Sequence, residues 1–271
     1  EAMELGKKSY LIDLIHGFDL LHIDPTKDPY TVGKVIDMDV NIRRTVELIE
    51  CVEKERIARG LPEISYEVGT EETNGGLTSS ENYEAFIKKL TARLDEKKLP
   101  HPAFIVGNTG TLTRLTENVG HVDSTSCKTL SAVAKKYAVG LKEHNGDYLD
   151  DAILLEHPAL GVTAMNVAPE FGTVETQAYL KLIEVEERLA GQGMITEVSK
   201  LGQVLRVEAV ESGRWKKWMV DGQEKLSPEE IFKDEKLTRL ITEISGHYTF
   251  NSDRVKAEIN KLYDNLALSG I

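Results

Sequence analysis

The chain has 271 residues, of which 41% are hydrophobic, so it is long enough for one large domain or two small ones. Its 45 acidic residues outnumber its 33 basic residues, and the formal net charge of -12 argues against nucleic acid or an anionic membrane as the main partner. The two cysteines, Cys51 and Cys127, make neither a disulfide framework nor a zinc-ligand spacing, so a cytoplasmic location is expected.

Short apolar runs, each followed by a polar loop and then by helical spacing, predict buried strands along the first part of the chain. The runs lie near residues 18–23, 64–68, 103–106, 137–141 and 162–167. Strands that alternate with helices in this way are typical of an α/β fold with a parallel sheet. The glycine-rich nucleotide motifs GxGxxG and GxxxxGK[ST] do not occur in the sequence.

The pattern weakens after residue 190. Residues 214–218, RWKKW, mix cations and aromatic rings, but the net charge favours tryptophans packed on the main domain over a nucleic-acid site. The sequence therefore predicts a strand–helix domain over residues 1–190 and a helical extension over residues 191–271 that packs on it.

Polar residues follow the predicted strands at their carboxyl ends. They are Asp24, Glu71, Asn108, Glu143, His144 and Asn166. In a (β/α)8 barrel all such ends converge on one mouth, whereas in an open doubly wound sheet they lie along a crevice. The barrel gathers more of them and is the preferred interpretation. His22, one position inside its strand, is interpreted as a packed or hydrogen-bonded core histidine.

The stretch GLKEHNGDY, residues 140–148, carries the densest polar cluster. Its Glu143, His144, Asn145 and Asp147 could supply a metal ligand, a general acid or base, and an anchor for a sugar hydroxyl. The alternative is an ordinary polar helix cap formed by Asp147.

The segment of residues 114–126 is long and polar for a connection between a strand and a helix. We expect a mobile lid whose His121 faces the pocket when the lid closes. A loop without function is the alternative.

Four segments occur in an order and at intervals that resemble one known family: GFDLLHID, SYEVGTE followed by Gly75-Gly76, KEHNGDY, and AMNVAPEFG. They resemble the tagatose-bisphosphate aldolase subunit family of the GatZ/KbaZ type, over residues 1 to about 266. This resemblance implies a TIM barrel related to class II, metal-dependent aldolases that act on a ketose or a ketose phosphate. Since residue 1 would correspond to a helix about three strand–helix units into that barrel, we expect these residues to carry the last five units plus a helical tail, with the missing strands coming from upstream or from another chain.

The resemblance also implies roles for the polar strand ends. Glu71 and His144 are the expected ligands of a divalent ion, zinc or similar, and Asp24, Glu143 and Asp147 are candidates for proton transfer or for holding sugar hydroxyls. Substrate contacts are expected from Asn108, His121, Asn145 and Asn166. Asn108 stands where class II aldolases place a histidine ligand, and Glu170 at the last strand–helix junction would repel a phosphate.

Three functions follow from these expectations. The first is metal-assisted aldol cleavage or carbon-4 epimerisation of a ketose. The second is a non-catalytic subunit that stabilises a separate class II aldolase, and the third is a sugar-binding regulator. The expected partners are a sugar or sugar phosphate together with an aldolase subunit or a second copy of this chain.

Overall fold

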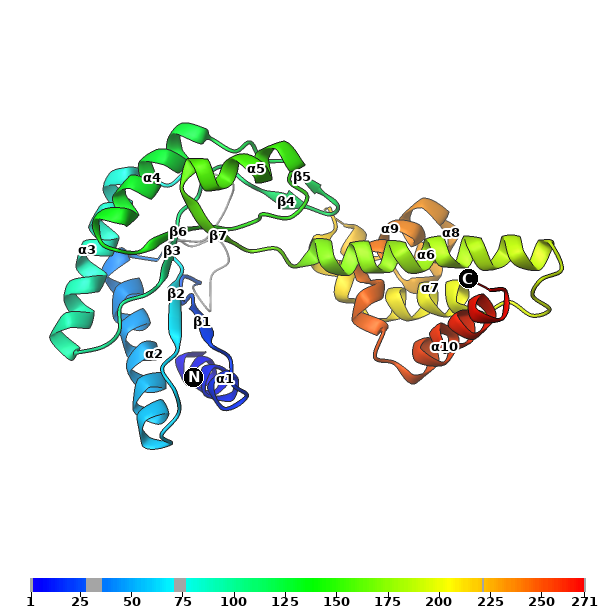
Figure 1. Cartoon of the computed structure of the whole chain (residues 1–271), viewed down its shortest axis with the longest axis horizontal. Coiled ribbons are helices and arrows are strands. Elements are labelled where there is room, and N and C mark those ends of the chain that lie inside the picture. The colour runs from blue at the N-terminus through cyan, green and yellow to red at the C-terminus, as the bar shows by residue number, and fades with distance from the viewer. Residues whose placement is uncertain (1, 28–35, 71–76, 221, 271) are drawn as a thin grey trace. The chain divides into compact units, whose positions relative to one another are not determined.

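The computed structural model divides the chain into two compact units (Figure 1). It describes residues 2–27, 36–70, 77–220 and 222–270. The first unit contains the described residues up to Thr113 together with Asn118–Asn166, and the second contains Arg114–Glu117 and the residues from Val167 onward. Each unit is described by itself below.

A parallel sheet organises the first unit. Its strands are β1 (Leu20–Ile23), β2 (Ser65–Val68), β3 (Phe104–Val106), β6 (Gly140–Glu143) and β7 (Val162–Met165), and they are hydrogen-bonded in the order β1-β2-β3-β6-β7. The prediction of an α/β fold with a parallel sheet is therefore confirmed. Among the described residues β1 and β7 each have one neighbouring strand, so a closed eight-stranded barrel stays a prediction.

Helices cover one face of this sheet. They are α1 (Ala2–Ile15), α2 (Met38–Ala58), α3 (Ser80–Lys97), α4 (Ser124–Lys136) and α5 (Asp151–Leu160), and α2, α3 and α4 lie on the same side of the strands in Figure 1. Side chains alternate along a strand, so residues such as Leu21, Ile23 and Ile105 point toward the helices and pack against helical residues such as Ile49 and Leu90. This apolar layer leaves the opposite face of the sheet for other side chains.

Capping residues set the helix starts. The side chain of Asp37 accepts hydrogen bonds from the amides of Asp39 and Val40 and caps the start of α2. Asp123 accepts from the Ser126 amide and starts α4 at Ser124. The segment expected as one long loop therefore contains the short strands β4 (Thr113–Arg114) and β5 (Glu117–Asn118) and the first turn of α4.

The fourth strand of the sheet begins later than predicted. Helix α4 extends to Lys136, and Ala138 takes a left-handed conformation with φ 56°, so the extended backbone starts at Gly140. The strand therefore covers Gly140–Glu143 and not residues 137–141. As a result, Lys142 and Glu143 lie inside the strand, where their side chains point to opposite faces.

The second unit is helical. It contains α6 (Pro169–Gly191), α7 (Leu201–Glu211), α8 (Pro228–Lys233), α9 (Glu235–Ser245) and α10 (Asp253–Leu268), with the 3-10 segments η1 (Arg214–Trp218), η2 (Gln223–Lys225) and η3 (Gly246–Thr249). Leu189 of α6 packs with Leu201 and Leu205 of α7 and with Ile259 of α10. Because its apolar stripe is buried there, α6 groups with the second unit, whereas the sequence placed the domain boundary at residue 190.

Trp215 is part of the core of this second unit. Its side chain is 1% exposed, and its indole Nε1 donates to Val210 O at 2.9 Å. It packs with residues such as Ile231 and Ile241 of the same unit. The tryptophan is therefore a packing residue, as expected, and it packs within the helical unit.

Through the described parts of the chain, no helix is both long enough and apolar enough to cross a membrane.

Candidate functional site

A group of ionisable side chains lies on the sheet face opposite the helix layer. In the parallel register His22 of β1 pairs with Glu67 of β2, and Val106 of β3 pairs with Lys142 of β6. Paired residues of neighbouring strands point to the same face, and His22 and Glu67 alternate with the buried Leu21, Ile23, Tyr66 and Val68. His22, Glu67 and Lys142 therefore share this face, and Asp24 and His144 follow directly after β1 and β6. We call these residues the strand-end cluster: His22, Asp24, Glu67, Lys142 and His144.

Glu67 is at the centre of the strand-end cluster. Lys142 Nζ donates to Glu67 Oε1, and His22 Nδ1 lies 2.9 Å from the same oxygen. On its other side, His22 Nε2 lies 3.6 Å from Asp24 Oδ2. A chain of alternating basic and acidic side chains thus connects β6, β2 and the end of β1.

Asp24 is held by its own turn. Its Oδ1 accepts from Thr26 Oγ1 at 2.6 Å and from the Thr26 amide at 3.2 Å. The carboxylate lies against the backbone of Gly69 at the end of β2, where a Cβ would collide with it. A glycine at this position allows the close approach between the two strand ends.

His144 lies beside His22, with ring centroids 5.3 Å apart. Its Nε2 is buried and has no hydrogen-bond partner among the residues that the structure describes. Unpaired buried polar atoms are rare in proteins, and one that lies in a group of charges is available for a ligand. The backbone of His144 is held by Thr111, whose Oγ1 donates to the carbonyl oxygen at 2.5 Å.

The two histidines have opposite pKa shifts. Burial by itself lowers the pKa of His22, but its contacts with Asp24 and Glu67 outweigh burial and raise it above the usual value. Burial, assisted by the nearby positive charges of His22 and Lys142, lowers the pKa of His144 to about 4. At neutral pH His144 is therefore a neutral imidazole, and it lies beside a histidine whose pKa is raised.

Both carboxylates of the strand-end cluster stay ionised. Burial raises their pKa, but the hydrogen bonds from His22 and Thr26 to Asp24, and from His22 and Lys142 to Glu67, outweigh it and lower the pKa of each carboxyl. Titratable groups whose pKa values are moved in opposite directions within one site are typical of acid–base catalysis.

Glu143 points away from the strand-end cluster, in contrast to the prediction that placed it at the mouth. It is fully buried and accepts from His157 Nε2 at 2.8 Å and from Thr109 Oγ1. His157 belongs to α5, so Glu143 lies on the helix-covered face. The difference follows from the later end of β6, which keeps Glu143 inside the strand, two positions after the core residue Leu141 and on the same face.

Two predicted residues lie outside the strand-end cluster. Asn108 is buried, and its backbone is hydrogen-bonded to Thr78. The side chain of His121 is exposed, and its amide donates to Gly110 O at 3.0 Å. A lid function for His121 stays a prediction.

Three further predicted residues form the turn after β6 and its connection to β7. Asn145 adopts φ 57°, and Asp147 is buried. Asn166 donates its amide to Glu143 O and accepts from the Gly146 amide, each at 3.0 Å. These bonds hold the ends of β6 and β7 together, and contacts of Asn145, Asp147 and Asn166 with a substrate stay predictions.

The predicted metal ligands can be compared with the structure only in part. Glu71 lies outside the described residues, and His144 belongs to the strand-end cluster. Within the described part of the chain no three His, Cys, Asp or Glu side chains converge as a metal-binding group. The donors that are present therefore do not fit a divalent ion by themselves, since Glu67 is already engaged by Lys142 and His22.

Sequence reasoning missed Glu67 and Lys142 and interpreted His22 as a core residue. It was right that His22 is held by polar contacts, but the side chain is 31% exposed and belongs to the site. The signal that could have found them is a charged residue inside an otherwise apolar strand, as in SYEV and GLKE. A charge there must be paired, and the pair identifies a polar face of the sheet.

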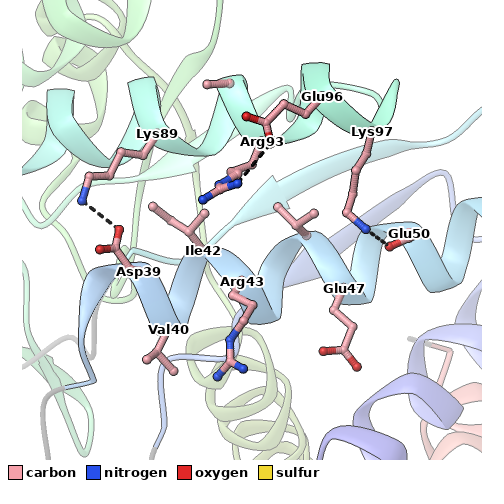
Figure 2. Close-up of a pocket in the computed structure, with 12 residues that line it drawn as sticks. Asp39, Val40, Ile42, Arg43, Glu47, Glu50, Lys89, Arg93, Glu96 and Lys97 are labelled. Atoms are coloured by element: carbon pink, nitrogen blue, oxygen red, sulfur yellow. Dashed lines mark hydrogen bonds and ion pairs between the residues drawn. The ribbon is translucent and has the colours of Figure 1, made fainter.

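A groove lies elsewhere, between α2 and α3 (Figure 2). It has a volume of about 980 Å³, and its rim carries the ion pairs Lys89–Asp39, Lys97–Glu50 and Arg93–Glu96. These charges satisfy one another on exposed helix surfaces, as is usual for neighbouring helices. We therefore take the strand-end cluster, and not this groove, as the candidate site.

Comparison with known proteins identifies related folds. The structure matches that of a probable tagatose 6 phosphate kinase from Sinorhizobium meliloti, with 18% identity over 98% of this chain and 65% of that chain, and a TM-score of 0.73. It also matches a glycerol complex of fructuronate-tagaturonate epimerase from Cohnella laeviribosi, with 12% identity over 97% of this chain and 64% of that chain, and a TM-score of 0.55. These likenesses show the fold. The chain spans less than two thirds of the length of either structure. No family model matches the sequence, and no curated protein matches it.

Proposed function

We propose that the strand-end cluster binds a ketose or ketose derivative and catalyses a retro-aldol step, which leads to aldol cleavage or to carbon-4 epimerisation. The observation that supports this most directly is the paired His22 and His144, with raised and lowered pKa values, between ionised carboxylates at the carboxyl ends of parallel strands. The fold likeness to an epimerase of sugar acids supports it by analogy alone.

The residues of the strand-end cluster suit the individual parts of a retro-aldol step. Ionised Asp24 accepts the proton of the carbon-4 hydroxyl while the bond between carbon 3 and carbon 4 breaks. The electron pair of that bond moves toward carbon 2 and leaves an enediolate on the carbonyl side and an aldehyde on the other. Addition of the enediolate to the opposite face of the aldehyde, with return of the proton from Asp24 to the carbon-4 oxygen, gives the carbon-4 epimer. Transfer of that proton to carbon 3 of the enediolate, followed by release of both fragments, gives aldol cleavage.

His144 and His22 position the reacting groups. Neutral His144, whose Nε2 is unpaired among the described residues, hydrogen-bonds a substrate hydroxyl without adding a charge. His22 lies between Asp24 and Glu67 and holds the Asp24 carboxylate in its ionised form. The step also needs a cation at the carbonyl oxygen, because an uncompensated enediolate is unstable in a partly buried site.

The divalent ion expected at Glu71 and His144 would supply such a cation by polarising the carbonyl. It stays a prediction, and metal analysis of the purified full-length protein tests it. Zinc or manganese bound at about one equivalent and lost on His144→Ala substitution would support it.

Turnover assays test the proposed function. The full-length protein is incubated with free and phosphorylated ketoses, and aldehyde products and carbon-4 epimers are followed by NMR. Asp24→Asn should reduce kcat by about 10²–10⁴-fold, because the amide cannot accept the proton. Asp19→Asn is the matched control, since Asp19 is exposed at the opposite end of β1. Equal turnover in both variants would contradict the assignment.

The non-catalytic subunit remains the alternative outcome. In that case the protein alone converts none of the ketoses, and its addition raises the stability or activity of a separate class II aldolase. Under this outcome Asp24→Asn and Asp19→Asn would support the partner equally well.

A further inference from the structure

Lys142 carries a positive charge into the centre of the strand-end cluster. We propose that its ammonium group is the cation that polarises the substrate carbonyl and stabilises the enediolate, in the place that a divalent ion would otherwise take. This assignment rests on the retro-aldol function proposed above and names the residue that provides its electrophile.

The position of Lys142 supports this role. The residue lies on β6 two positions before His144, it is 3% exposed, and Nζ donates to Glu67 Oε1. His22 Nδ1 approaches the same oxygen at 2.9 Å. One carboxylate oxygen thus faces both the Lys142 ammonium group and the His22 ring.

The ion pair with Glu67 compensates the buried ammonium group of Lys142. Burial of a lone ammonium is costly, but Glu67 remains ionised next to it, because the contacts with His22 and Lys142 lower the Glu67 pKa. An ammonium group has three N–H donors, and Glu67 takes one of them. The group therefore retains donor capacity for a carbonyl oxygen while its charge is held in place.

The groups around Lys142 are compatible with a substrate oxygen next to its ammonium group. The positive charge of Lys142 is among the causes that lower the pKa of His144, so the two side chains lie within electrostatic reach. Neutral His144 then presents a nitrogen that has no partner among the described residues, on the same side of the sheet. A planar ligand with two adjacent oxygens can be held by Lys142 at one oxygen and by His144 at the other.

The chemical step needs no change in the lysine. When the carbon–carbon bond breaks, its electron pair becomes part of the enediolate, and the oxygen gains negative charge next to the ammonium. The proton stays on Nζ, no covalent bond to nitrogen forms, and no oxidant or reductant takes part. A preorganised cation in a site with little water is effective for this purpose.

Binding of an enediolate mimic tests the assignment without relying on turnover. The probe is glycolohydroxamate, a planar ligand with two adjacent oxygens, titrated calorimetrically into the full-length protein in the presence of EDTA. The unmodified protein should bind, and Lys142→Met should weaken binding by about 100-fold. Lys136→Met is the matched control, because Lys136 is an exposed lysine on α4 and should leave the affinity unchanged.

A second variant separates loss of the cation from loss of folding. Lys142→Met leaves the buried Glu67 without its partner, so Lys142→Met combined with Glu67→Gln replaces the ion pair by neutral groups. Circular dichroism should show a cooperative melt for the double variant, and its probe binding should be lost as well. Recovery of tight binding in this folded double variant would overturn the assignment.

Three other outcomes would overturn the role of Lys142. The unmodified protein could fail to bind glycolohydroxamate in EDTA, or it could bind the probe only when zinc or manganese is added. The third is that Lys142→Met binds the probe with unchanged affinity. If no ketose is turned over but probe binding depends on Lys142, the retro-aldol function fails while the cation site stands. If turnover survives Lys142→Met and depends on metal, the function stands and the cation is the metal.

Discussion

Lys142 and Glu143 are neighbours in one strand, yet the two faces of the sheet give them opposite surroundings. Glu143, on the helix-covered face, is fully buried and is paired with His157 and Thr109. Lys142, on the other face, is paired with a carboxylate that also contacts His22. Both side chains are buried, and each has a polar or charged partner.

The two faces of the sheet differ in whether the ring nitrogens of their histidines all have hydrogen-bond partners. His157 uses both ring nitrogens, Nε2 with Glu143 and Nδ1 with Ile153 O at 2.6 Å. His144, on the face of the strand-end cluster, has an unpaired Nε2 among the described residues and a pKa lowered to about 4. A charged pair whose members are all satisfied stabilises a fold, whereas one with unused capacity and shifted pKa values can bind and react.

Removal of the buried Glu143 should have the largest effect on stability. Glu143→Ala leaves His157 and Thr109 without their acceptor and opens a cavity, so the free energy of unfolding should fall by about 3–5 kcal/mol. Chemical denaturation measures it. Asp24→Asn at the other face should change stability by less than Glu143→Ala while it removes turnover, and the reverse ranking would contradict the comparison.

The pH dependence of stability sharpens the same contrast. Because the pKa of His144 is lowered from 6.5 to about 4, the unfolded chain binds more protons than the folded chain between these values, and stability falls as the pH falls through this window. Between about pH 7 and about pH 5 the free energy of unfolding of the unmodified protein should fall by about 1 kcal/mol more than that of His144→Gln, after allowance for partial exposure.

His22 should behave in the opposite sense. Its raised pKa stabilises the folded state at low pH, and this contribution is lost as the pH rises through the folded-state pKa. NMR titration of the imidazole Cε1–H signals measures both groups in one experiment. A common pKa near the usual value for His22 and His144 would contradict the asymmetry on which the site depends.

The smallest effect is expected at the groove between α2 and α3. Lys89→Ala removes the ion pair between Lys89 and Asp39. Both side chains are exposed, so the free energy of unfolding should change by about 0.5 kcal/mol or less. Turnover and probe binding should stay unchanged. A clear loss of either would mean that this groove, and not only the strand ends, takes part in function.

The sequence by itself determined the alternation of strands and helices. Apolar runs bounded by polar loops located each strand to within a few residues, since burial on the helix side demands aliphatic residues in every strand. It also placed Asp24 and His144 directly after strands, where the structure brings them to the same cluster through His22. Asn108 was selected by the same rule and is buried after β3, with its backbone bonded to Thr78, whereas His121 was selected from a long polar segment and is exposed.

Only the tertiary structure decided which face each charged residue occupies. The side-chain period of a strand is two, so the start of β6 at Gly140, set by the left-handed turn at Ala138, directs Lys142 toward Glu67 and Glu143 toward His157. A shift of one residue would exchange the two. No local pattern encodes that start, because it depends on where α4 ends and on which partners across the sheet can pair a buried charge.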